Sequence, residues 1–589
     1  MSSQAGIIKR VNGSLIIAQG LKGAKIGDAL YIGELKLIGE VVRISGRDVA
    51  LQCYEDTSGV KPGEPVIGTG NPLVAELAPG LIGEIFDGLE RSELELWRLT
   101  GPFIGRGYKV ASLKRDKKWD FEPRVKPGEE VEEGDILGTV QESSVIEHRI
   151  LVPVGVRGVI ESIEEGRFTI EDPIAVLRTR DGRRIELRML QTWPVRVPRP
   201  YRERLPVSEP LFTGQRVIDT FFPIAKGGTA AIPGGFGSGK TITLQQIAKW
   251  SDADIVIYVG CGERGNEMAD ILTHFPELED PRTGRKLIER AIFIANVSNL
   301  PVAAREASVY MGVTIAEYFR DQGYHVAVII DSTSRWAEAL RDLSGRLEEI
   351  PAEEGYPAYL AERIAELYER AGRVVALGKE GRIGSVTVMG AVSPPGGDFS
   401  EPVTSPTLRF VGALWALDTE LAYRRHFPAI NWLRSFTKYV EVLEEFWKKH
   451  EPDWREYREK ALALLEEASR LEEIARVVGE KSLPNEQRLI LLASEIIREG
   501  FLVQNAYHPV DRYCPPEKQV KILKTILAFY DLASPLVKAG VPVDRIRSLG
   551  SVVELLRLKE REKLEDIEKA FESVKRDLEE LRREYGIGG

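Results

Sequence analysis

The segment Gly234–Thr241 constrains the fold of this chain more strongly than any other part of its sequence. It reads GGFGSGKT, which fits the P-loop pattern G-x-x-x-x-G-K-[S/T], and it stands between the apolar segment TAAIP and the helical pattern ITLQQIAKW. Glycines let backbone N–H groups curl around phosphates, and a following helix directs its positive dipole end toward them. The sequence therefore predicts a strand, a phosphate-binding loop and a helix. The predicted nucleotide-binding residues are Gly234, Gly235, Phe236, Gly237, Ser238, Gly239, Lys240 and Thr241.

Three residues are expected to act on phosphate and metal. Lys240 is predicted to bridge the β- and γ-phosphates, and the Thr241 hydroxyl is predicted to ligate Mg²⁺. A P-loop also needs an acid at the end of a neighbouring strand, and the apolar run AVII at 327–330 ends at Asp331. Such a run is a weak signal alone and a strong one in a chain with a P-loop. Asp331 is therefore predicted to hold the metal through its water shell.

Hydrolysis also needs a group that orients and polarises the attacking water. The apolar run IVIYV at 255–259 leads into the sequence GCGER, which ends in Glu263 and Arg264. Ligands bind at the C-terminal edge of strands in open α/β sheets. We therefore predict that Glu263 is the water-activating base and that Arg264 contacts the γ-phosphate or a subunit interface. The alternative is an ordinary surface Glu–Arg pair, which contributes little energy.

Composition limits the partners and the compartment. The chain has 80 Lys and Arg against 90 Asp and Glu, a net charge of −10. This negative net charge argues against a protein whose main role is to bind nucleic acid or anionic lipid. Three cysteines cannot form a disulfide framework, which favours a reducing compartment. The start MSSQAGIIKRVNG does not resemble a signal peptide, and no apolar run approaches 18 residues. We expect a cytoplasmic protein that meets a membrane only through other proteins.

Two β-rich stretches precede the P-loop. Residues 1–73 contain six or so short strands, with an Asn12-Gly13 hairpin turn, and predict a small β-barrel or sandwich. Residues 116–189 predict a β-rich insert; their V-K-P-G…G-D pattern resembles biotin- and lipoyl-carrier modules, but no lysine stands on the hairpin a carrier needs. Residues 74–115 are expected to connect back to the nucleotide-binding domain. That domain is predicted at 190–437, beginning with a proline-rich linker and continuing with alternating buried strands and helices.

The remainder of the chain, 438–589, predicts a helical domain. Its last helix carries an apolar heptad stripe. The stripe either packs on the helix's own domain or is offered to a helix of another subunit. Its members are Leu564, Ile567, Phe571, Val574, Leu578, Leu581 and Tyr585.

Five long motifs resemble the catalytic A subunit of the archaeal-type and vacuolar-type rotary ATPase. They are IYVGCGERGNE at 257–267, DSTSRWAEALR at 331–341, PAEEGYP at 351–357, SPPGGD at 393–398 and RRHFPAINW at 424–432. The resemblance runs essentially from end to end, including the insert before the P-loop domain. It implies a multidomain fold: an N-terminal β-barrel, the β-rich insert, a central RecA-like α/β P-loop domain and a C-terminal α-helical domain.

The resemblance also implies a function, a cofactor and partners. Such subunits hydrolyse or make ATP, with Mg²⁺, in a hexamer of alternating catalytic A and non-catalytic B subunits, coupled to proton or sodium movement. Central shaft and peripheral stalk subunits join this head to a membrane sector, on whose cytoplasmic face it lies. An arginine finger comes from the B subunit in trans. Carried over by position, Phe427 packs near the adenine, and Tyr507 is a second adenine-contacting residue.

A departure from the family pattern at Gly235 and three alternative functions bear on this assignment. Gly235 stands where A subunits usually carry Pro or Ala, which predicts a looser P-loop with altered nucleotide release. A hexameric helicase or RNA translocase shares the P-loop and the catalytic acids, but the net charge and the insert disfavour it. A homohexameric export ATPase has a similar core. The assignment as a non-catalytic B subunit is disfavoured because B subunits lack an intact P-loop, whereas this chain has one.

Overall fold

The computed structural model describes residues 5–101, 105–298 and 300–587. The chain forms two compact units. The first consists of Met1–Val207, Lys226–Thr229 and Ala253–Phe410, and the second of Ser208–Ala225, Ala230–Asp252 and Val411–Gly589. Within the described ranges, no helix has the length and apolar character needed to span a bilayer. Residues 1–4, 102–104, 299, 588 and 589 belong to segments whose structure is predicted above, but they lie outside the described residues.

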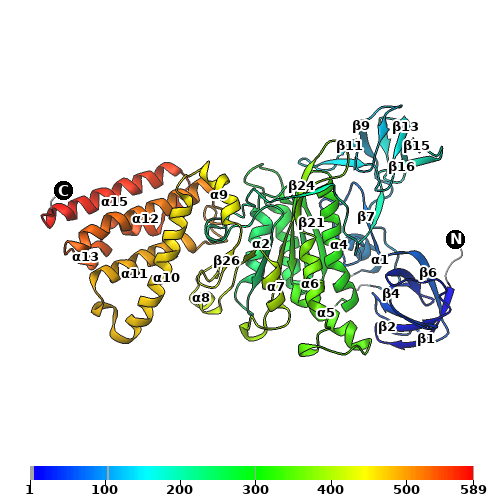
Figure 1. The fold of residues 1–589 in the computed structure, drawn as a ribbon, viewed down its shortest axis with the longest axis horizontal. Coiled ribbons are helices and arrows are strands. Elements are labelled where there is room, and N and C mark those ends of the chain that lie inside the picture. The colour runs from blue at the N-terminus through cyan, green and yellow to red at the C-terminus, as the bar shows by residue number, and fades with distance from the viewer. Residues whose placement is uncertain (1–4, 102–104, 299, 588–589) are drawn as a thin grey trace. The chain divides into compact units, whose positions relative to one another are not determined.

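The first unit begins with a closed six-stranded barrel, as predicted (Figure 1). Its apolar side chains alternate along the strands and point inward, including Ile16, Leu37 and Leu51. The first hairpin turn lies one residue later than expected: Asn12 pairs with Leu15, and Gly13 alone takes a positive φ of 57°. The strand order β1-β2-β5-β4-β3-β6 is built from β1 (Ala5–Asn12), β2 (Leu15–Gln19), β3 (Asp28–Ile32), β4 (Leu37–Ser45), β5 (Asp48–Cys53) and β6 (Pro65–Pro72).

The β-rich insert forms two four-stranded sheets with orders β10-β13-β15-β16 and β12-β11-β9-β14. A further two-stranded sheet pairs β7 (Val74–Leu77) with β17 (Gln191–Pro194), so a strand that precedes the insert in sequence lies beside the strand that follows it. The insert strands are β9 (Trp119–Pro123), β10 (Glu130–Val131), β11 (Ile136–Gln141), β12 (Glu147–Leu151), β13 (Gly158–Ile163), β14 (Gly166–Phe168), β15 (Pro173–Arg178) and β16 (Arg184–Arg188).

A parallel sheet with the order β8-β21-β20-β22-β24 forms the centre of the first unit. Its middle strands are almost entirely buried, which explains their continuous apolar sequences. The strands are β8 (Ile85–Phe86), β20 (Ile255–Cys261), β21 (Ala291–Asn296), β22 (His325–Asp331) and β24 (Ile383–Val392), with β23 (Gly372–Val375) and β18 (Glu203–Leu205) added antiparallel. The helices are α1 (Glu93–Thr100), α3 (Gly265–His274), α4 (Val302–Asp321), α5 (Thr333–Arg346), α6 (Leu360–Glu369) and α7 (Thr404–Phe410).

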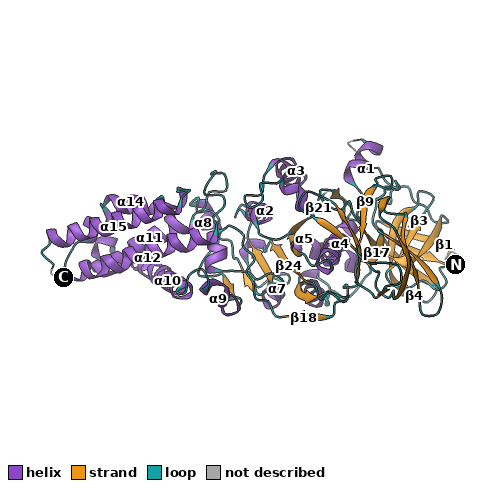
Figure 2. Ribbon diagram, turned by 90° about the horizontal axis from the view of Figure 1, so that it is seen from above, coloured by secondary structure: helices purple, strands orange, loops and turns teal. Residues whose placement is uncertain are grey.

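The second unit combines the P-loop with a helical bundle. β19 (Thr229–Pro233), β25 (Ala413–Leu414) and β26 (Phe436–Thr437) pair in that order. The bundle helices pack side by side (Figure 2). The helices of this unit are α2 (Lys240–Trp250), α8 (Thr419–Tyr423), α9 (Val440–Lys448), α10 (Trp454–Val478), α11 (Asn485–Ile497), α12 (Pro516–Lys538), α13 (Val543–Arg547), α14 (Gly550–Leu556) and α15 (Leu564–Glu584).

The heptad stripe of the last helix packs within its own unit. Ile567, Val574, Leu578 and Leu581 are buried, and α15 contacts α12 and α14. Tyr585 at the end of the stripe is 40% exposed. The first of the two alternatives for this helix therefore describes it.

A buried ion pair ties the segment before the P-loop to the helical bundle. Arg216 and Asp511, both almost fully buried, lie 2.7 Å apart. Arg216 also donates to the carbonyls of Phe501 and Val503, and its backbone N–H donates to Gln504. These bonds join parts of the chain almost 300 residues apart. The guanidinium is thereby desolvated together with its partners.

Replacing Asp511 by Ala should destabilise the second unit by about 3–5 kcal/mol, because it leaves the Arg216 charge buried without a counter-ion. Hydrogen exchange of peptides from α11 and α12 would report the loss as faster exchange. The control is Asp531→Ala on α12, where a half-exposed carboxylate pairs with Lys460 and removal should cost at most about 1 kcal/mol. Equal exchange rates in the two variants would contradict this prediction.

Candidate nucleotide-binding and hydrolytic residues

The P-loop connects β19 to α2 as the sequence predicts, and two of its glycines are required by backbone conformation. Gly237 and Gly239 have φ of 77° and 83°, in the left-handed region that side chains disfavour. Gly234 is required by space instead, since a Cβ there would lie 2.5 Å from Ser238 Oγ. Ser238 is buried, and its hydroxyl donates to the Gly235 carbonyl at 2.7 Å. The loop is thus braced internally around the N-terminus of α2.

Lys240 and Thr241 begin α2 and are both half-buried. At this position, the backbone N–H groups of the first turn and the helix dipole favour an anion. Phe236 is 86% exposed at the tip of the loop. The arrangement can accept the phosphates of a nucleotide at the start of α2.

The two aromatic residues predicted to contact adenine lie on neighbouring segments of the second unit. Phe427 packs on the P-loop, because a Cβ at Gly239 would lie 3.2 Å from its ring. The Phe427 carbonyl accepts a 2.8 Å hydrogen bond from the N–H of Gln504, three residues before Tyr507. Phe427 is 41% exposed and Tyr507 83% exposed. Both rings therefore retain a surface that a flat ligand can cover.

A further set of contacts holds the segment that carries Tyr507. The Asn505 N–H donates to Asp511 at 2.7 Å, and the Tyr507 N–H donates to the side-chain oxygen of Asn505 at 2.9 Å. Asp511 is the partner of buried Arg216. No local sequence pattern marks Asp511, Asn505 or Arg216 as supports of this segment, so these three residues were not predicted.

Glu263 and Arg264 follow the C-terminal end of β20 in the first unit. Gly262 has a φ of 74° and donates its N–H to the Asn296 carbonyl at 2.7 Å, which turns the chain out of the sheet. The Glu263 carbonyl accepts from the Ser298 N–H at 2.8 Å. Glu263 is half-buried, whereas Arg264 is exposed and occupies the N-cap position of α3. A half-buried carboxylate at a strand end is suited to orienting a water molecule.

Asp331 ends β22 and is fully buried. It is the register partner of Gly260 in β20, so the two strand ends carrying Asp331 and Glu263 are adjacent within the same sheet. The Tyr258 hydroxyl donates to Asp331 Oδ2 at 3.1 Å. Burial, followed by the charge of Asp331, raises the pKa of Tyr258 well above its usual value, so this phenol stays a donor. Tyr258 fixes the carboxylate, a role that its place in an apolar run does not reveal.

Two arginines flank the turn before Glu263. A Cβ at Gly262 would lie 2.9 Å from side-chain atoms of both Arg305 and Arg335, so only glycine fits between them. The hydrogen bond to Glu338 raises the pKa of Arg335, and the negative charge of Glu263 adds to the effect. Arg305 comes from α4, and nothing in the local sequence around it indicates this placement. The turn thus places the carboxylate of Glu263 where it interacts with the positive charge of Arg335.

Gly235 can be replaced without backbone strain. Its φ is not in the left-handed region, and a Cβ there would make an ordinary 3.4 Å contact with Thr419 Cγ2. Gly235→Pro should therefore slow ADP release by about 2–5-fold, because it removes freedom from the empty loop. Stopped-flow release of a fluorescent ADP would measure this, with Gly235→Ala expected to fall between proline and parent. Indistinguishable release rates would show that this position does not set loop mobility.

Family models match most of the chain. The ATP synthase alpha/beta family nucleotide-binding domain matches residues 214–437 and the family's beta-barrel domain matches 8–70. The ATP synthase alpha/beta subunit barrel-sandwich domain matches 110–196, and the C-terminal domain of V and A type ATP synthase matches 443–547. In structure, the chain is similar to the ATPase EscN of the enteropathogenic Escherichia coli type III secretion system, with a TM-score of 0.62. At 21% identity, over 89% of this chain and 100% of EscN, this likeness shows the fold alone.

Curated relatives match over nearly the full length. The A subunit of the A-type ATP synthase of Thermofilum pendens is 56% identical, over 100% of this chain and 98% of the relative. The corresponding protein of Methanopyrus kandleri is 57% identical, with 99% of each chain covered. That of Thermococcus kodakarensis is 55% identical, over 99% of this chain and 100% of the relative. With the P-loop at the start of α2 and acids at two adjacent strand ends, these matches show that the chain belongs to the family of A subunits of the A-type ATP synthase.

Proposed function

We propose that this chain is the catalytic subunit of a multi-subunit rotary ATP synthase, where it makes or hydrolyses ATP coupled to proton or sodium translocation. The observation that carries the proposal is the content of the matched nucleotide-binding domain, residues 214–437. It contains the P-loop at the N-terminus of α2 together with Glu263 and Asp331 at adjacent strand ends. The alternative of an export ATPase rests on fold likeness at 21% identity.

In hydrolysis, Glu263 orients a water molecule and accepts its proton as the water oxygen attacks the γ-phosphorus. The bond to the β–γ bridging oxygen breaks, leaving ADP and inorganic phosphate. Lys240 and the backbone N–H groups of the P-loop, Gly234–Thr241, stabilise the phosphate charge. Arg264 contacts the γ-phosphate or a subunit interface. Phe427 packs near the adenine, and Tyr507 is its second contact.

The donor set fits Mg²⁺ that is anchored mainly by phosphate. Among the described residues, no group of three or more His, Cys, Asp or Glu side chains could hold a metal ion. Magnesium usually keeps several waters and binds through one or two protein oxygens together with substrate phosphates. The Thr241 hydroxyl would supply one oxygen, and Asp331 would act through water. The bound ion would neutralise charge on the phosphates.

The proposed assembly places the chain in an alternating hexamer with non-catalytic B subunits, which supply an arginine finger in trans. Central shaft and peripheral stalk subunits connect this head to a membrane sector at the cytoplasmic face, without direct contact to nucleic acid or lipid. The proposed division of the chain is a barrel at 1–73, a connection at 74–115, the insert at 116–189, the nucleotide-binding domain at 190–437 and the helical domain at 438–589.

Nucleotide binding by this chain tests the proposal. Lys240→Ala should weaken MgATP binding at least about 10-fold, measured by calorimetry, because it removes a charge-assisted contact to the phosphates. Lys249→Ala, at the other end of α2, is the matched control and should change the affinity less than 2-fold. Equal weakening by both substitutions, or no binding by the parent, would refute the proposed site.

A further inference from the structure

A cavity that is open to solvent lies within the second unit, outside the P-loop; it is lined by residues of the helical domain and by Arg424 at the end of α8. It has a volume of about 500 Å³, in the range of small-molecule sites. Four arginines and three glutamates line it, in a chain whose net charge is −10. The arginines come from four separate segments: the end of α8, the last turns of α10, the residue after α11 and the end of α13.

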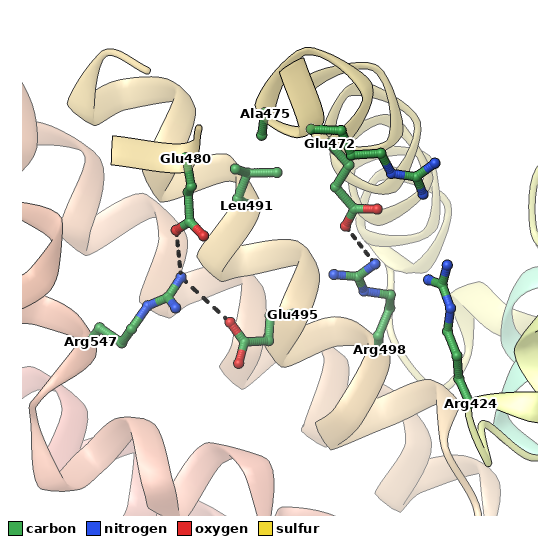
Figure 3. A pocket seen from close by; sticks show the side chains of 9 residues that line it. Arg424, Glu472, Ala475, Glu480, Leu491, Glu495, Arg498 and Arg547 are labelled. Carbon is green, nitrogen blue, oxygen red and sulfur yellow. Dashed lines mark hydrogen bonds and ion pairs between the residues drawn. The ribbon is translucent and has the colours of Figure 1, made fainter. Parts of the chain in front are cut away.

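The charges are not evenly paired around this cavity. On one side, Arg547 lies 3.2 Å from Glu480 and 3.5 Å from Glu495, so both carboxylates face one guanidinium (Figure 3). On the other side, Arg498 points toward Glu472 at 2.7 Å, and Arg424 extends beside it (Figure 3). The glutamates are thus occupied by Arg547 and Arg498.

Two further guanidiniums have little or no neutralisation. Within the described part of the chain, the one carboxylate that Arg424 approaches is that of Glu420, which lies 4.0 Å away and is 81% exposed. Arg476 stands one turn after Glu472 on α10 and has no carboxylate within 4.0 Å among the residues that the structure describes. Of these two and Arg498, therefore, Arg498 alone is paired with a glutamate that lines the cavity, Glu472, among the described residues. This excess of positive charge favours a ligand with at least two negative charges.

We propose that this cavity binds a small phosphate-bearing anion through the guanidiniums of Arg424, Arg476 and Arg498. Guanidinium forks match phosphate oxygens in bidentate geometry, and three of them from different segments surround a dianion. Arg424 is three residues before Phe427, whose ring packs on Gly239 of the P-loop. Occupancy of the cavity restrains this connecting segment; its effect on nucleotide binding rests on the proposed function of the P-loop.

The connection between the two places is short, and one residue of it, His426, is buried. His426 stands between Arg424 and Phe427 and is 7% exposed. Burial, followed by the positive charges of Arg498 and Lys559, lowers the pKa of His426 to about 4, so this ring is neutral. An anion bound at Arg498 would offset one of the positive charges that act on His426, within the segment that joins Arg424 to Phe427.

The test uses the full chain with Lys240→Ala in the background, so that the P-loop contributes least to anion binding. Inorganic pyrophosphate and AMP are titrated by calorimetry, which distinguishes a free from a nucleotide-borne phosphate. At least one of them should bind, and Arg476→Ala should weaken that binding at least about 10-fold. Arg470→Ala is the matched control: this exposed arginine of α10 pairs with Glu466 and Glu467 and should change affinity less than 2-fold.

Hydrogen exchange of the peptide covering 420–430 should slow when the anion binds in this background. No binding of either probe, or equal weakening by Arg476→Ala and Arg470→Ala, would overturn the proposal. A cavity that binds while the parent P-loop fails to bind MgATP would leave the inference standing and refute the proposed function alone.

Discussion

Adding a non-catalytic B subunit should raise MgATP hydrolysis by this chain by about 10³–10⁵-fold, the range of an arginine finger supplied in trans. In the proposed assembly the isolated chain supplies Lys240, Glu263 and Asp331 but not the B subunit's guanidinium, so the charge that develops on the transferred phosphoryl group would not be fully stabilised. The expected result is a chain that binds nucleotide alone and turns it over slowly. Steady-state phosphate release with and without the B subunit measures the difference.

The control for this experiment is a B subunit with its arginine finger replaced by Ala, which should assemble without restoring turnover. Fast hydrolysis by the isolated chain, unchanged by B, would instead favour an autonomous export-type ATPase. Stimulation by RNA or single-stranded DNA would favour a helicase or translocase. Either outcome would contradict the proposed assembly.

Glu263→Gln in the reconstituted complex should lower kcat by about 10²-fold or more, because the amide cannot take a proton from the attacking water. MgATP affinity should stay within about 2-fold, since the proposed phosphate contacts come from the P-loop and not from Glu263. Single-turnover phosphate release measures the chemical step, and calorimetry measures the affinity.

The matched control is Asp270→Asn on α3, the helix that follows Glu263. This carboxylate is 58% exposed and pairs with His274, so turnover should remain near that of the parent. A loss confined to nucleotide affinity in Glu263→Gln would assign Glu263 to binding. Equal losses in both variants would assign the effect to α3 as a whole.

Features that depend on local sequence patterns could be predicted. The order of β19, the P-loop and α2 could be predicted because the glycines of the loop and the start of the helix lie within eight consecutive residues. The buried strands leading to Glu263 and Asp331 show as continuous apolar runs, since both faces of a parallel sheet are covered. The predicted position of the hairpin turn was wrong by one residue. Asn12 and Gly13 both tolerate positive φ, so the pairing of the two strands decides which residues form the turn.

Features made by contacts between distant segments could not be predicted. Tyr258 supports Asp331 from 73 residues away, and Arg216 reaches Asp511 across 295 residues. A tyrosine inside an apolar strand, or an arginine in the segment before the P-loop strand, has no periodic partner that marks its role. The arginine cavity is a similar case, because its lining comes from four segments that only the folded bundle brings together.

The hydrogen bonds around Arg216 and Gln504 also have a mechanical consequence. Gln504 bonds to the Phe427 carbonyl, to Gly214 and, through its side-chain oxygen, to Arg216. The bundle, the segment before the P-loop and the P-loop side of Phe427 are thus joined by short, stiff links. We therefore expect a displacement of the segment that carries Gln504 to move Phe427, whose ring packs against Gly239 of the P-loop, and the reverse to hold for a movement of the P-loop.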